Sequence, residues 1–213
     1  MSKIIDPSFS SSTIIEDVKT MCDAGQASMA YFYFDFRDLH KQDLRDLVPS
    51  LLTQLSSRSD LRCDILSRLY SDHDNGARQP SDETLIRCLK DMFTLPDQRS
   101  TYLIMDALDE CSNNIGIPSP RERVLQLVKR LVDLHIPNLH ICVTSRPEVD
   151  IQDVLEPVTS LQVSLHDQRG QKKDIEDYVR SVVYSTSEPI MRRWKDEDKE
   201  HVIKTLCERA DGM

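Results

Sequence analysis

The 213-residue sequence is poor in glycine, and its five glycines lie far apart. A loop that wraps nucleotide phosphates needs closely spaced glycines and a lysine, because backbone N–H groups must close around the oxygens and a positive charge must neutralise them. The glycines here are Gly25, Gly76, Gly116, Gly170 and Gly212. The pattern G-x-x-x-x-G-K-[ST] is therefore absent from the sequence.

Long apolar runs, a basic leader and closely spaced cysteines are missing as well. No run approaches the roughly 20 apolar residues that a membrane helix needs, and the start MSKIIDPSFSSS lacks the layout of a secretory signal. The six cysteines contain no C-x-x-C pair, which favours reduced thiols over a disulfide framework or a zinc site. We therefore expect a cytoplasmic protein without membrane contact.

Basic residues are fewer than acidic ones, 27 against 36, so the net charge is −9. Nucleic acids and anionic membranes are bound mainly through Lys and Arg, and this charge balance predicts neither as a partner. Hydrophobic residues make up 39% of the chain and charged residues 30%. This composition is typical of a packed soluble domain.

Short apolar runs rich in β-branched and aromatic residues predict four buried strands, at 30–36, 101–106, 139–145 and 160–165. Apolar residues at helical spacing lie between them, and residues 58–95 are predicted to be helical apart from turns at 74–76 and near Pro80. Strands that alternate with helices indicate parallel βαβ units. The predicted fold is α/β, a parallel sheet with helices on both faces in three layers.

Two further helical patterns follow the last predicted strand. Apolar residues recur at helical spacing over residues 175–183 and again over 202–207. We expect residues 1–168 to form the α/β core and residues 169–213 to begin a separate helical domain. The mixed charges at 121–123 and 195–200 are interpreted as solvated helix faces.

The segment YLIMDALDE, residues 102–110, runs from an apolar strand directly into three acids, Asp106, Asp109 and Glu110. Ligands of open parallel sheets bind at the carboxyl ends of the strands. Carboxylates at that position are suited to hold Mg²⁺ and to orient an attacking water. The alternative is a strand followed by a solvated acidic turn.

A second polar strand end follows in LHICVTSRP, where Thr144, Ser145 and Arg146 come after an apolar run. In a parallel sheet this end lies at the same edge as the acids. An arginine there is suited to reach a γ-phosphate, and the hydroxyl groups are suited to hydrogen-bond it. The alternative is a helix cap followed by a surface charge.

YLIMDALDE followed by ICVTSRP resembles the NACHT family of signal-transduction ATPases with numerous domains, with its fungal incompatibility-type and nephrocystin-like N-terminal members. MAYFYFDFRD and KKDIEDYVRS resemble the same group, so the resemblance covers residues 12–213. It implies a P-loop NTPase-like fold and an ATP- or GTP-driven switch that associates with itself or with other protein domains. On this resemblance, Asp106 of the Walker B strand serves magnesium and Asp109 or Glu110 serves the water. Thr144, Ser145 and Arg146 contact the nucleotide.

The sequence departs from the family at the phosphate loop. The helix STIIEDVKTM resembles the one that follows the loop, which places Asp6 near a glycine position and Pro7 near the lysine. The strand before the loop lies mid-sheet in the family, between those matching 139–145 and 160–165. We expect a partial or degenerate module, cut from a longer gene at both ends, that binds neither ATP nor magnesium. The alternatives are a non-enzymatic protein-interaction remnant and, less favoured, a metal-dependent phosphotransfer or nuclease site on the three acids.

Overall fold

The protein was analysed as a computed structural model that describes residues 11–57, 59–96, 99–114, 116–162, 169–185 and 194–209. The chain divides into two compact units. One is Ser11–Ser160, and the other contains Leu161–Met213. Within the described residues, no helix combines the length and apolarity that crossing a membrane requires.

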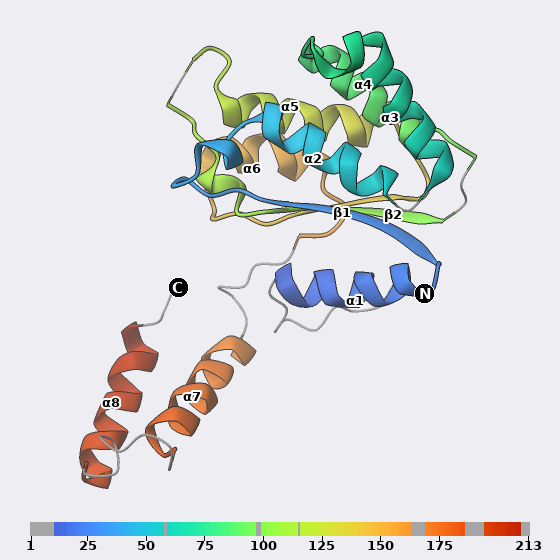
Figure 1. Cartoon of the computed structure of the whole chain (residues 1–213). Coiled ribbons are helices and arrows are strands. Elements are labelled where there is room, and N and C mark those ends of the chain that lie inside the picture. The colour runs from blue at the N-terminus through green and yellow to red at the C-terminus, as the bar shows by residue number, and fades with distance from the viewer. Residues whose placement is uncertain are drawn as a thin grey trace. The chain divides into compact units, whose positions relative to one another are not determined.

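The larger unit is built on a sheet of three parallel strands in the order β1-β2-β3 (Figure 1). They are β1 (Ala27–Tyr33), β2 (Ser100–Asp106) and β3 (Leu139–Val143). Tyr33 pairs with Asp106, and Met105 pairs with Val143, so the three carboxyl ends lie level at one edge. This arrangement brings the two polar strand ends together.

Helices cover both faces of this sheet (Figure 1). On one face α2 (Leu44–Ser56), α4 (Asp82–Phe93) and α5 (Pro120–Asp133) bury leucine-rich stripes in a common core with the sheet. On the opposite face lies α1 (Ser11–Asp23), which contacts β1 and β2. The predicted α/β class, a parallel sheet with helices on both faces in three layers, is confirmed.

The remaining elements of this unit are short or peripheral. Residues 58–95 were predicted to be helical with turns at 74–76 and near Pro80, and the described residues there confirm this. The elements are η1 (Leu39–Lys41), α3 (Asp60–Asp72), η2 (Asp74–Gly76), η3 (Leu108–Glu110), α6 (Val149–Leu155) and η4 (Glu156–Val158).

The start of α5 shows how local sequence places an element beside the strand ends. The Ser119 hydroxyl accepts a hydrogen bond from the Glu122 N–H at 3.2 Å, and Pro120 occupies the first helical position. Serine caps the free N–H groups of a helix start, and proline has no N–H to leave unpaired there. The helix therefore begins at Pro120, and residues 111–119 connect it to the acidic segment.

Three strand predictions need correction. The strand predicted at 30–36 runs instead from Ala27 to Tyr33. The strand predicted at 139–145 ends at Val143, and Thr144 bonds the end of β2 through its N–H and its hydroxyl. The prediction of a strand at 160–165 is wrong for the residues that the structure describes. Residues 160–162 do not form a strand, and Leu161 is 68% exposed. A short apolar run forms a strand only when a neighbour pairs with it. Residues 163–165 lie outside the described residues.

The smaller unit contains α7 (Arg169–Val183) and α8 (Asp196–Arg209), which contact each other. Arg180 joins them, with its Nη1 atom 2.6 Å from a Glu200 oxygen. The Tyr184 hydroxyl donates to the same carboxylate at 3.0 Å. Both helices predicted after residue 168 are present. Five of the six charged residues at 195–200 are exposed, as expected for that run.

Candidate functional site

The acidic segment begins with a backbone turn at the end of β2. Ala107 has φ 55° and ψ 49°, the left-handed region that residues with a side chain seldom adopt. The short helix η3 follows at once and carries Asp109 and Glu110. Because of this turn, the two acids do not continue the direction of β2, the strand that ends at Asp106.

Asp106 is hydrogen-bonded across the sheet to Thr144. The Thr144 hydroxyl donates to Asp106 Oδ1 at 2.6 Å and accepts from the Ala107 N–H at 3.0 Å. The two bonds join the ends of β2 and β3. The residue predicted to serve magnesium and one predicted to contact nucleotide are therefore adjacent, and each has the other as its partner.

Asp109 is similarly engaged with Arg146. Its side chain is 9% exposed, whereas that of Arg146 is 79% exposed. Ser145 lies next to this pair, and its hydroxyl donates to the Arg146 carbonyl at 2.9 Å. The carboxylate of Asp109 holds the segment that leaves β3 by accepting the Arg146 backbone N–H at 3.0 Å.

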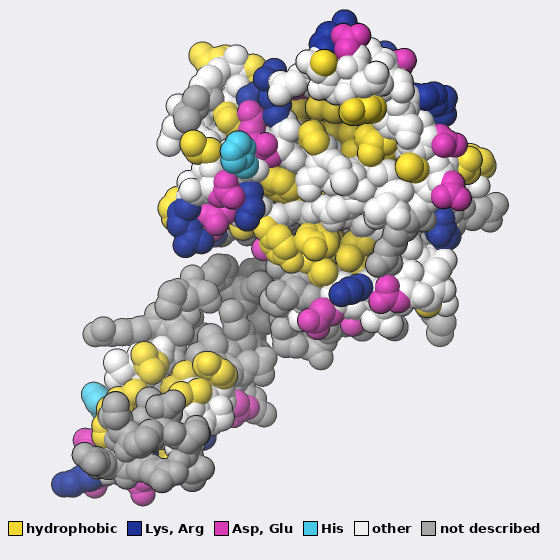
Figure 2. Space-filling view, viewed as in Figure 1, with side chains coloured by type: hydrophobic (Ala, Val, Ile, Leu, Met, Phe, Trp, Pro, Cys, Tyr) yellow, Lys and Arg dark blue, Asp and Glu magenta, His cyan; other side chains and the backbone are white. Residues whose placement is uncertain are grey.

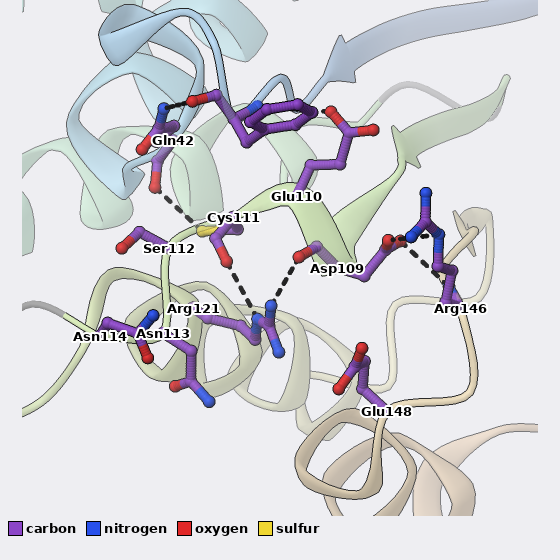
Figure 3. A pocket seen from close by; sticks show the side chains of 11 residues that line it. Gln42, Asp109, Glu110, Cys111, Ser112, Asn113, Asn114, Arg121, Arg146 and Glu148 are labelled. Atoms are coloured by element: carbon purple, nitrogen blue, oxygen red, sulfur yellow. Dashed lines mark hydrogen bonds and ion pairs between the residues drawn. The ribbon is translucent and has the colours of Figure 1, made fainter.

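Glu110 reaches the third strand end. Its Oε2 atom accepts the Phe36 N–H at 3.3 Å, in the loop that leaves β1 (Figure 3). Each of the three acids thus accepts a hydrogen bond from a loop or residue at the end of a neighbouring strand. The acidic segment ties the three strand ends together.

Arg121 also takes part, and its predicted place on a solvated helix face is wrong. It is 8% exposed, and its guanidinium donates to the carbonyl oxygens of Asp109 and Cys111 and contacts the Asp150 carboxylate at 3.2 Å. The sequence held a signal for this. Arg121 precedes Val124 and Leu125 by three and four residues, which puts it on the buried stripe of α5.

A cavity of about 560 Å³ opens at this edge of the sheet (Figure 3). Asp109, Glu110 and Arg146 line it, whereas Asp106, Thr144 and Ser145 do not. The structure therefore places the six predicted site residues at one edge but divides them between two surroundings. The other lining residues are Phe36, Gln42, Cys111, Ser112, Asn113, Asn114, Arg121 and Glu148.

The donor set at this edge does not fit a magnesium-nucleotide site. Mg²⁺ in such sites is held by a carboxylate together with a phosphate-loop hydroxyl and the phosphates, and the sequence has no such loop. In the part of the chain that the structure covers, no three Asp, Glu, His or Cys side chains gather where they could hold a metal ion.

Cys111 is the thiol nearest to the acids, and it is chemically quiet. Its Sγ atom donates to the Gln42 carbonyl at 2.9 Å, and burial raises the pKa of the thiol to about 12. A thiolate is the nucleophilic form of cysteine. Cys111 therefore stays protonated near neutral pH and supplies no nucleophile to the cavity.

Comparison with known proteins gives a family match and a structural similarity. The family model described as "Nephrocystin 3, N-terminal" matches residues 7–146. A chain of the solved "Structure of Drosophila ORC bound to AT-rich DNA and Cdc6" is 12% identical, with a TM-score of 0.31. That similarity covers 94% of this chain and 74% of the other. Among curated proteins, none matches this chain.

Proposed function

The chain belongs to the nephrocystin 3 N-terminal family, and from this premise we propose that it is a partial or degenerate NACHT module of a signal-transduction NTPase. The relatives that it resembles are expected to switch between association states with ATP or GTP and magnesium. In this form the chain neither binds nor hydrolyses ATP. It acts in the cytoplasm through contacts with other protein domains or with itself.

The pairing of Asp109 with Arg146 carries this proposal. The acid assigned to the attacking water and the arginine assigned to the γ-phosphate contact each other, at 3.0 Å through the backbone N–H and 3.4 Å through Nε. Binding a nucleotide would separate them, and the chain has no phosphate loop whose contacts would offset that loss.

Isothermal titration with Mg-ATP and with Mg-GTP tests the proposal. We expect no binding heat beyond dilution. The matched variant is Asp106→Asn, which keeps an acceptor for Thr144 but removes the charge that would serve magnesium. A dissociation constant in the low micromolar range for the original chain, weakened by Asp106→Asn, would show that the strand ends form a nucleotide site after all.

A second candidate is a protein-interaction module that never used a nucleotide. It is favoured by apolar side chains exposed on the loops and helices that leave the strands: Phe36 at 66%, Leu39 at 81% and Val149 at 71%. Exposed apolar clusters commonly mark contact surfaces. The two candidates separate in a version that carries an added phosphate loop, because only a degenerate NTPase module would then gain Mg-ATP binding.

A further inference from the structure

The two outer edges of the sheet differ in whether their backbone groups are hydrogen-bonded. At the outer edge of β1, a side chain occupies them. The Tyr31 N–H donates to Gln54 Oε1 at 3.1 Å, and Gln54 Nε2 donates to the Tyr31 carbonyl at 2.8 Å. One carboxamide from α2 thus satisfies both outward-facing backbone groups at the centre of β1. A second bond at 3.1 Å, to the Ser50 hydroxyl, holds the carboxamide in place.

The hydrogen bonds at both ends of β3 show which of its residues face outward. The Thr144 N–H donates to the Met105 carbonyl at 2.9 Å, and the Asn138 carbonyl accepts from Thr101 at 2.7 Å, so both residues face β2. The N–H and C=O of one strand residue point the same way, and the direction alternates along the strand. The backbone N–H and C=O groups of Leu139, Ile141 and Val143 therefore point away from β2.

These outward groups are unpaired along most of the strand. The Leu139 N–H donates to the Ile136 carbonyl at 3.2 Å. Within the described ranges, no strand or side chain bonds the N–H groups of Ile141 and Val143 or the three outward carbonyls. Strand edges normally carry charge, proline or cover that prevents pairing. The strand LHICV has no charged residue and no proline, and none of its side chains is fully buried.

We propose that the outer edge of β3 pairs in an antiparallel manner with the same edge of a second copy of this chain, in a register centred on Ile141. The centre is a hydrogen-bonded pair of the two Ile141 residues, which exchange two N–H···O bonds. On either side Leu139 of one copy faces Val143 of the other. Each of these outer pairs adds one bond, from the Val143 N–H, because the Leu139 N–H is already used.

This register matches side chains as well as backbone groups. Leu139, Ile141 and Val143 pack partly against the core on the face that α2, α4 and α5 cover. The centred register keeps all of them on that face in both copies. His140 then lies opposite Cys142 on the other face. No charged side chain of the strand meets another, so the self-pairing brings no like-charge repulsion.

Gln54 limits the assembly to two copies. A protein with two open edges can add copies without end, whereas a self-complementary contact at one edge closes after a single pairing. Figure 2 shows hydrophobic side chains where β1 lies, and Tyr31 and Tyr33 are 37% and 38% exposed there. Without the hydrogen bonds from the Gln54 carboxamide, the outer edge of β1 would also be suited to pair with another strand.

Sedimentation velocity of the full chain over a concentration series is the first measurement. We expect a shift from the mass of one chain to twice that mass. The variant Ile141→Pro removes the central outward N–H, and proline is tolerated on an edge strand where the N–H faces solvent. Ile141→Pro should stay at the mass of one chain with an unchanged circular dichroism spectrum. Gln54→Leu, a change of similar size on the opposite edge, should grow beyond two copies.

Several outcomes would overturn the proposal. These are a wild-type chain that stays single at every concentration, an Ile141→Pro chain that still doubles, or a Gln54→Leu chain that stops at two copies. If Ile141→Pro does not fold, hydrogen exchange of the wild-type chain decides. The Ile141 and Val143 amides should exchange more slowly as concentration rises, and exchange rates independent of concentration would refute the pairing.

Discussion

Arg146 is held by Asp109 through its backbone as well as its side chain. Its N–H donates to Oδ1 at 3.0 Å, and its Nε lies 3.4 Å from Oδ2. The backbone bond fixes the segment between β3 and α6, and it is the shorter of the two contacts. Asp109 therefore has a structural role in this chain, as the acceptor of the Arg146 backbone hydrogen bond.

Asp109→Ala should lower the free energy of unfolding by about 1–2 kcal/mol, because the Arg146 N–H loses its partner. Asp109→Asn keeps an acceptor oxygen and should lower it by less than about 1 kcal/mol, since the Arg146 side chain is largely exposed and its ion pair is screened. Urea unfolding of the two variants measures this. Equal losses for Ala and Asn would mean that charge, rather than the backbone bond, makes the contribution.

Arg121→Met should lower the free energy of unfolding by about 2 kcal/mol. Two carbonyl oxygens lose a charged donor, but Asp150 is 38% exposed and can turn to water, so the loss stays below that of a fully buried pair. Arg130→Met is the matched control on the same helix, because Arg130 pairs with the exposed Glu83. Its effect should stay under about 1 kcal/mol. If the two variants lost equal free energy of unfolding in urea, the buried contacts of Arg121 would not contribute more than an exposed ion pair.

Stability should fall at alkaline pH through Cys111. The pKa of its thiol is raised from 9.0 to about 12 in the folded chain by burial. A raised folded-state pKa gives stability that is present below pH 9 and is lost as pH rises toward 12, because the unfolded chain releases the proton first. Cys111→Ala should show a shallower loss of stability above pH 9 than the wild-type chain. Parallel curves for the two chains would rule out this contribution.

The sequence predicted the parts of the fold that depend on local pattern. The run at 101–106 and the helical stripes of α2 and α5 gave the sheet and its covering layers, because a buried apolar period is readable without neighbours. The exposed position predicted for Arg121 was wrong because it rested on the mixed charges at 121–123. The spacing of Arg121 from Val124 and Leu125 places it on the buried stripe of α5. The strand expected at 160–165 lacked a partner where it is described.

Contacts between distant segments could not be predicted. The pairing of Gln54 with Tyr31 depends on the distance between α2 and the edge of β1, and glutamines on helix surfaces are common. The turn at Ala107 is also invisible in the sequence, because nothing in the local sequence requires a left-handed alanine. The roles assigned to all six site residues stay predictions, since only their positions and contacts are seen: Asp106, Asp109, Glu110, Thr144, Ser145 and Arg146.

The last prediction concerns a strand added before α1. The crossover from β1 to β2 runs through α2, α3 and α4 on one face, whereas α1 lies on the opposite face. Crossovers between parallel strands are right-handed in nearly all proteins. A right-handed connection through α1 must therefore come from the β3 side of the sheet. A strand placed before α1 would lie along the outer edge of β3.

An extended version of the chain, with a strand and a G-x-x-x-x-G-K-S loop fused before Ser11, should fill that edge. It should melt at a higher temperature than the original chain and stay at the mass of one copy, because the new strand takes the groups that pair the two copies. Mg-ATP should raise its melting temperature further by mass action. A matched fusion with the loop lysine replaced by alanine should keep the first gain and lose the second. If the extended chain melts no higher and still doubles in mass, the strand does not occupy this edge, and the handedness argument fails for this sheet.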